Sequence, residues 1–135
     1  MTCTYAATVK TNRLSNVVDA IASKTYAAGT GTATAGQLVI GTASLSGSTG
    51  VLATIALAAT PATVSGSVLT LSGTPLSVSA SATGTAALAE IRNNAGTTIV
   101  SGLTVGTSGT DIIISTTSIT SGQTVTCTAG TITHG

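Results

Sequence analysis

Residues Thr85–Val100 have the sequence TAALAEIRNNAGTTIV, and this stretch predicts a β-hairpin. From Thr85 to Arg92, aliphatic side chains fall on alternate positions, as in a strand with one buried face. Asn93–Gly96 predicts a tight turn, because Asn and Gly accept positive φ angles. Thr97–Val100 would pair back across that turn, so antiparallel pairing of neighbouring strands is the expected local structure.

The same pattern of short strands and turns extends on both sides of the hairpin. Eight strands are expected, at spacings of roughly 8–12 residues, and no repeat of fixed length is present. Their predicted ranges are Gln37–Ala43, Val51–Leu57, Val68–Ser72, Leu76–Ala80, Thr85–Arg92, Thr97–Val100, Asp111–Ser115 and Gln123–Thr133. The expected fold class is therefore mainly β, an antiparallel β-sandwich or jelly-roll-like barrel with one short N-terminal helix.

The expected helix covers residues 12–24. Leu14, Val17, Val18 and Ile21 follow the i, i+3, i+4, i+7 spacing, which places four aliphatic side chains on one stripe. Thr11 is the expected N-cap, and Lys24 lies where a cation stabilises the helix dipole. We expect residues 1–10 to form an N-terminal arm and residues 11–135 to form a single β-rich domain.

Charged and aromatic side chains are scarce in this chain. The 135 residues include four Lys or Arg, three Asp or Glu, one His, two Tyr, no Phe and no Trp. Enzyme chemistry needs titratable groups gathered in one site, so the composition predicts a protein without catalytic, cofactor-binding or metal-binding residues. The core is expected to be thin, so association with copies of the chain or with a larger surface would add buried area.

Two arrangements of polar residues could in principle support catalysis. A Ser/His/Asp triad would need Asp111 and His134, but His134 is the penultimate residue and no Gly-x-Ser-x-Gly elbow is present. A carboxylate pair would need Glu90 and Asp111. We expect Glu90 to form an exposed ion pair with Arg92 instead, and Asp111 to serve the turn before a strand.

Other kinds of site are also disfavoured by the sequence. Cys3 and Cys127 form neither a disulfide framework nor a zinc motif, so two reduced, packed thiols are expected, although one bridge remains an alternative. No phosphate-binding loop is present. The cations form no basic stripe for nucleic acid, and no apolar run could span a membrane. We see no secretory signal, so synthesis in a cytoplasm is expected.

Threonine alternates with smaller or apolar residues near the C-terminus. Thr124, Thr126 and Thr128 flank Val125 and Cys127, and Thr131 and Thr133 continue the row. Similar Thr rows occur on ice-binding β-solenoids, but there they recur at a fixed coil length, which this chain lacks. The solvent-facing side of an antiparallel strand is the expected explanation.

The C-terminal third resembles a family of small structural proteins of tailed bacteriophages. The resemblance lies in the segments AEIRNNAGTTIVSG (residues 89–102), VGTSGTD (105–111), TTSI (116–119), GQTV (122–125) and TIT (131–133). Family members also tend to begin with an amphipathic helix, as Arg13–Ile21 does here. They often carry aromatic residues ahead of the Arg-Ile pair, where this chain has Ala86, Ala87 and Leu88.

This resemblance implies a virion component, and specifically a capsid decoration (cement) protein that bridges subunits of the major capsid protein. The implied location is the capsid surface, after assembly in the host cytoplasm, and self-association, for example as a trimer, is implied too. The alternatives are a tail or head-fibre component and a surface carbohydrate-binding module. A carbohydrate module would have to build its aromatic platform from Tyr5 and Tyr26.

Overall fold

The predicted hairpin is formed by β7 (Leu88–Arg92) and β8 (Thr98–Gly106), which pair antiparallel. Asn93 closes the turn in two ways. Its backbone N–H donates to the Thr97 carbonyl at 2.9 Å, and its side-chain Oδ1 accepts from the N–H groups of Ala95 and Thr97, both at 3.0 Å. Gly96 has a φ of 87°, so the turn uses the conformation that Gly allows at low cost.

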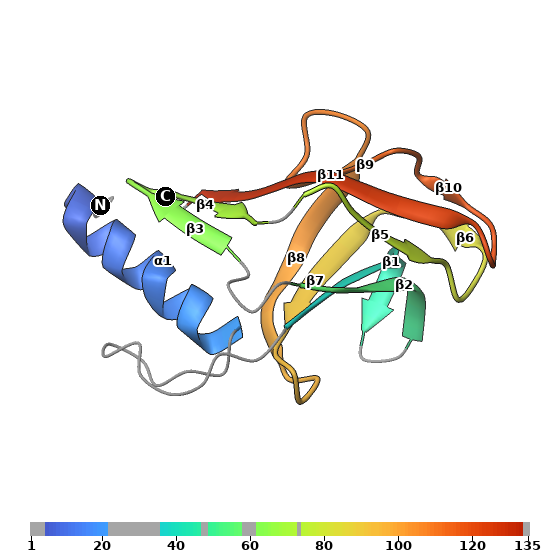
Figure 1. Cartoon of the computed structure of the whole chain (residues 1–135), viewed down its shortest axis with the longest axis horizontal. Helices are drawn as coiled ribbons and strands as arrows, with labels where there is room; N and C mark the ends of the chain where they lie inside the picture. The colour runs from blue at the N-terminus through green and yellow to red at the C-terminus, as the bar shows by residue number, and fades with distance from the viewer. Residues whose placement is uncertain (1–4, 22–35, 47–48, 58–61, 73, 134–135) are drawn as a thin grey trace.

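The computed structural model describes residues 5–21, 36–46, 49–57, 62–72 and 74–133. These residues form one helix and a set of mostly short strands (Figure 1). The elements besides the hairpin are α1 (Ala7–Ile21), β1 (Gln37–Ser46), β2 (Thr49–Ala56), β3 (Ala62–Ser65), β4 (Val68–Leu71), β5 (Leu76–Ser79), β6 (Gly84–Thr85), β9 (Ile112–Ile114), β10 (Ser118–Ile119) and β11 (Thr124–Thr133). The predicted mainly-β class with one N-terminal helix is confirmed.

One large sheet folds over on itself to make two layers. Its strand order is β2-β1-β7-β8-β9-β11-β4-β3, and β5 pairs with β11 beyond the end of β4. In Figure 1, β3, β4, β5 and β11 form the upper layer, above β1, β2 and β7. The Ser81 N–H donates to the Leu52 carbonyl at 2.8 Å, which ties the end of β5 to the β2 edge. The layers are therefore arranged as a β-sandwich joined at both sides.

The pair β8 and β9 is parallel, which the antiparallel prediction did not include. Parallel strands usually need a long crossover connection. Here only five residues, 107–111, join them, because just Val105–Gly106 pair with Ile112–Ile113. These residues form a short loop that leads from β8 to β9. The strand β9 runs in the same direction as β8 and pairs with β11 of the upper layer.

The structure differs from the predicted strands in two further ways. The predicted strand Thr85–Arg92 is divided into β6 and β7, since the Ala86 N–H donates to the Thr117 carbonyl and the Ala87 N–H donates to the Gly41 carbonyl. This change of partner places β6 against β10, away from the main sheet. The short strands β3 and β10 were not predicted.

The core between the layers is aliphatic. Its buried residues are chiefly Leu, Ile, Val and Ala, and none of the described core residues is aromatic. The fully buried large side chains include Leu38, Ile40, Ile55, Leu69, Ile91, Ile112, Ile114 and Ile119. These residues come from both layers, so the sheet buries one continuous apolar face as a sandwich requires.

The helix α1 packs beside β3 and β4 (Figure 1). The predicted apolar stripe is confirmed: Leu14 and Ile21 are buried, and Val17 and Val18 are half-buried against the core. The predicted range is shifted, because α1 begins at Ala7 and includes residues 7–10 of the predicted arm. Residues 22–24, like residues 1–4 of the arm, lie outside the described residues.

Thr11 is not the N-cap of this helix. The first bond of the helix runs from the Lys10 N–H to the Ala6 carbonyl at 3.1 Å, and Ala6 and Ala7 have high helix propensity. Thr11 lies one turn inside, where its hydroxyl is 3.0 Å from the Ala7 carbonyl and 2.6 Å from the Gly66 carbonyl. The side chain therefore connects α1 to the turn between β3 and β4.

Candidate functional site

Asp111 closes the loop between β8 and β9. Its Oδ2 accepts from the Thr104 N–H and from the Thr104 hydroxyl, both at 3.0 Å, and its own N–H donates to that hydroxyl at 3.1 Å. The Asp111 carbonyl accepts from the Thr131 N–H of β11 at 2.8 Å. The predicted turn role at a strand entrance is confirmed. His134, the other candidate of the triad, lies outside the described residues.

Glu90 and Arg92 form the predicted ion pair. The Arg92 Nη2 lies 2.8 Å from the Glu90 Oε2, and the Arg92 Nε also donates to that oxygen at 3.1 Å. The pair is not exposed as expected, since the two side chains are only 12% and 14% accessible. Glu90 lies opposite the fully buried Val39 of β1, and the Thr98 hydroxyl donates to it at 3.3 Å. Glu90 and Asp111 thus have separate partners.

Cys127 lies in the core, on β11, with a free thiol. Its Sγ donates to the Ala129 carbonyl at 3.4 Å. Burial raises the pKa of the Cys127 thiol above its ordinary value. The thiolate is the reactive form, so this cysteine is a poor nucleophile. Cys3 lies outside the described residues, and a bridge between the two stays untested.

The described part of the chain offers few residues for a metal site, a membrane-spanning helix or an aromatic binding platform. Within it, no group of three or more His, Cys, Asp or Glu residues lies together. No helix there has both the length and the apolar character needed to cross a membrane. The Tyr5 ring is covered by the Arg13 guanidinium, whose carbon lies 3.8 Å from the ring centroid. Tyr26 lies outside the described residues.

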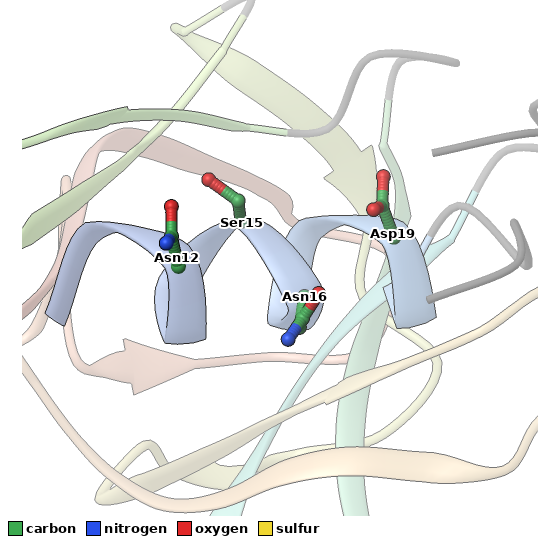
Figure 2. A pocket seen from close by; sticks show the side chains of 4 residues that line it. All are labelled: Asn12, Ser15, Asn16 and Asp19. Atoms are coloured by element: carbon green, nitrogen blue, oxygen red, sulfur yellow. The ribbon is translucent and has the colours of Figure 1, made fainter. Parts of the chain in front are cut away.

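A shallow depression of about 270 Å³ lies along α1 (Figure 2). It is lined by Asn12, Ser15, Asn16 and Asp19, which all belong to the polar side of one helix. The side chains of Asn12, Ser15 and Asp19 point to the same side in Figure 2, whereas Asn16 points away from them. The Ser15 hydroxyl is already used, since it donates to the Thr11 carbonyl at 2.9 Å. These four residues were not predicted as a site, although their helical spacing is visible in the sequence.

A second candidate surface is the outer side of the upper layer, which we call the hydroxyl face. Strand register aligns its threonines and serines across β3, β4, β5 and β11: Thr131 lies opposite Thr70, which lies opposite Thr63, and Thr126 lies opposite Ser77. Its hydroxyl-bearing residues are Thr63, Ser65, Thr70, Ser77, Ser79, Thr124, Thr126, Thr128, Thr131 and Thr133. The expected solvent-facing Thr row of β11 is thus confirmed and forms part of a wider face.

Among the described residues, the strands of the hydroxyl face carry no charged side chain, but Asp111 borders the face, since its carbonyl accepts from the Thr131 N–H at 2.8 Å. Lys10, Arg13 and Asp19 lie on α1, Glu90 and Arg92 on β7, and Asp111 in the β8–β9 loop. Its Thr128 hydroxyl donates to the Ile113 carbonyl at 3.3 Å. The register shift between Cys127 and Ala129 interrupts the Thr spacing, so the face lacks the regular period of an ice-binding solenoid.

No known protein family, curated protein or solved structure matches the chain.

Proposed function

We propose that this chain is a structural protein of a bacteriophage virion, a decoration protein that stabilises the head by bridging subunits of the major capsid protein. The observation that carries the proposal is the role of the polar residues in the segments that resemble phage structural proteins. Asn93 closes a turn, Asp111 fastens a loop, and the Gln123 Oε1 accepts from the Thr120 N–H at 2.9 Å. These side chains maintain a rigid scaffold, as a structural role requires.

Bridging would act through mass action. A protein that binds the assembled shell and not the free subunits shifts the equilibrium toward the shell. The scarcity of charge favours contacts made by apolar burial and neutral hydrogen bonds. Association of copies with one another, for example as trimers at local threefold positions, would place several contacts on the lattice at once.

Two alternatives differ in location or partner. A tail or head-fibre component would use the same kind of β domain at far fewer positions. A carbohydrate-binding module would need an exposed aromatic platform. The stacking of Arg13 on Tyr5 disfavours that use of Tyr5.

The location and copy number in purified virions test the proposal. We expect hundreds of copies spread over the head lattice, measured by quantitative gel analysis and by labelling with an antibody in electron micrographs. A handful of copies at the tail tip would contradict a decoration role and favour the fibre alternative.

The predicted arm has a separate test. Removing residues 1–4 leaves α1 and its first hydrogen bond in place, so the domain should keep its unfolding temperature. Reduced occupancy on heads would support an arm that contacts the shell. Unchanged occupancy would rule that role out.

A further inference from the structure

The helix α1 is not attached to the domain evenly along its length. Residues 5–9 are all exposed, whereas Leu14 and Ile21 are buried. In Figure 1 the N-terminal end of α1 lies at the outer edge of the molecule. The helix therefore has two parts, which we call the N-terminal segment (residues 5–13) and the anchored half (residues 14–21).

The anchored half is held by close packing. Its residues Leu14 and Ile21 belong to the core, and Ile21 is fully buried. Ile21 also lies against Gly36, next to the start of β1, where an added Cβ atom would be only 2.5 Å from the Ile21 Cγ2. Detaching this half would therefore expose apolar core surface and cost much of the stability of the domain.

The N-terminal segment has weaker ties to the domain. None of its residues is buried, and its Val9 side chain is 40% exposed. The Arg13 guanidinium stacks on the Tyr5 ring at 3.8 Å, but this contact joins two members of the segment and does not hold the segment to the sheet. The Thr11 hydroxyl does make such a link, through the Gly66 carbonyl at 2.6 Å.

The sequence of the N-terminal segment is also a weak helix former. Thr8, Val9, Thr11 and Asn12 all have low helix propensity. The first turn contains no acidic residue, and Lys10 is a cation near the positive end of the helix dipole. In water a helical residue gains little more from its hydrogen bond than it loses in backbone entropy. The helical form of this segment therefore depends on the bond that Thr11 makes.

We propose that the N-terminal segment is releasable: it unfolds and refolds while the anchored half and the sandwich stay folded, and the bond from Thr11 to Gly66 sets the balance. The inference goes beyond the proposed function and does not depend on it. The part of the chain that can extend as an arm then reaches to Arg13, since burial begins at Leu14. Unfolded, residues 5–13 would span about 30 Å, roughly twice their length as helix.

Native-state hydrogen exchange, followed residue by residue by NMR, tests the proposal. The amides of residues 11–13 have their helical acceptors inside the N-terminal segment, and those of residues 18–21 have theirs inside the anchored half. We expect amides 11–13 to be at least about a hundredfold less protected than amides 18–21. Their exchange should not accelerate in low urea, because local opening exposes little surface, whereas exchange of amides 18–21 should accelerate.

Two variants test the cause. Thr11→Val removes the hydroxyl but keeps the β-branched shape, and it should lower the protection of amides 11–13 about two- to tenfold, the worth of one neutral hydrogen bond. Thr11→Ser keeps the hydroxyl and should retain that protection. The matched control, Ile21→Val, removes one buried methyl group from the anchored half. It should lower the protection of amides 18–21 about two- to tenfold and leave amides 11–13 unchanged, because their opening does not disturb that contact.

The remaining outcomes would overturn the proposal. Equal protection and equal urea dependence of the two sets of amides would show that α1 opens as one unit with the domain. A loss of protection at amides 11–13 in Ile21→Val would show the same. Unchanged protection in Thr11→Val would mean that the bond to Gly66 does not hold the segment, and a complete lack of protection in the wild type would mean that the segment is not helical in solution.

Discussion

At the residue scale, Asp111 takes the place of a missing strand partner. Beyond the short parallel overlap, β9 no longer lies beside β8, and the outward N–H of Thr104 would lack a backbone acceptor. The Asp111 carboxylate accepts a hydrogen bond from this N–H and another from the Thr104 hydroxyl. The sequence predicted that Asp111 serves a turn. Its partner, Thr104, could not be predicted, because their contact depends on how the chain passes from β8 to β9, which no local pattern encodes.

Replacing Asp111 by Ala should lower the free energy of unfolding by about 1–3 kcal/mol, because the Thr104 N–H loses its acceptor. Asp111→Asn keeps one acceptor oxygen and should lose less. Urea denaturation measures both, and hydrogen exchange at the Thr104 amide should accelerate in the Ala variant. Equal stability of Asp111→Ala and the wild type would show that water replaces the carboxylate without cost.

Cys127 links stability to alkaline pH. Its folded-state pKa is raised by burial, so the native state holds the thiol proton more tightly than the unfolded chain, where the pKa is about 8.5. This contribution to stability is fully present below that value and is lost as the pH rises toward the folded-state pKa. Urea denaturation between about pH 7 and pH 10 should show the loss, relative to Cys127→Val, which removes the titrating group. Parallel pH profiles of the two proteins would contradict it.

The ion pair of Glu90 and Arg92 shows which part of a site can be predicted from one strand. Residues two apart lie on the same side of a strand, so the pairing follows from sequence. Its burial does not, because Val39 and the Thr98 hydroxyl come from neighbouring strands.

At the element scale, the position of the helix followed from four aliphatic residues, but its start did not. The apolar stripe begins at Leu14, whereas the first turns are exposed and contain only weak signals. Val9 lies in these turns and is 40% exposed, so it does not extend the apolar stripe toward the N-terminus. The bond from Thr11 to the Gly66 carbonyl depends on a hairpin more than fifty residues away.

Leu14→Ala should destabilise the protein by about 2–5 kcal/mol, since it removes a buried side chain between α1 and the sheet. The helical signal in circular dichroism should be lost at a lower urea concentration than in the wild type. Val9→Ala, at an exposed position of the same helix, is the matched control and should change stability by no more than about 0.5 kcal/mol. A comparable loss from both variants would contradict the assignment of the effect to the buried contact of Leu14.

As for the helix, only part of the strand arrangement could be predicted from the sequence. Alternating patterns placed most of them within a few residues, because each buries one face against a single core. Partner changes escaped prediction: the break between β6 and β7 arises from bonds to Thr117 and Gly41, which lie in other parts of the chain.

At the scale of the whole molecule, the mainly-β class follows from strand spacing and composition, whereas the hydroxyl face does not. The Thr row of β11 is visible in the sequence. Its continuation across Ser77, Thr70 and Thr63 requires the register of four strands, two of which lie on the same edge of β11. A face assembled from distant segments becomes recognisable only once the topology is known.

The distribution of charge leads to a prediction for the whole particle. If the proposed contact with the head is made by apolar burial and neutral hydrogen bonds, binding to heads should change by less than about threefold between about 0.1 M and 1 M NaCl, although the screening length falls from about 10 Å to about 3 Å. Cosedimentation at several salt concentrations measures this. A steep loss of binding would instead indicate that charged groups take part in the contact, and Lys10 and Arg13 of α1 would be the first to test. Lys10→Gln and Arg13→Gln would flatten the salt dependence if these residues lie in the contact, whereas a contact without them leaves binding unaffected by either change.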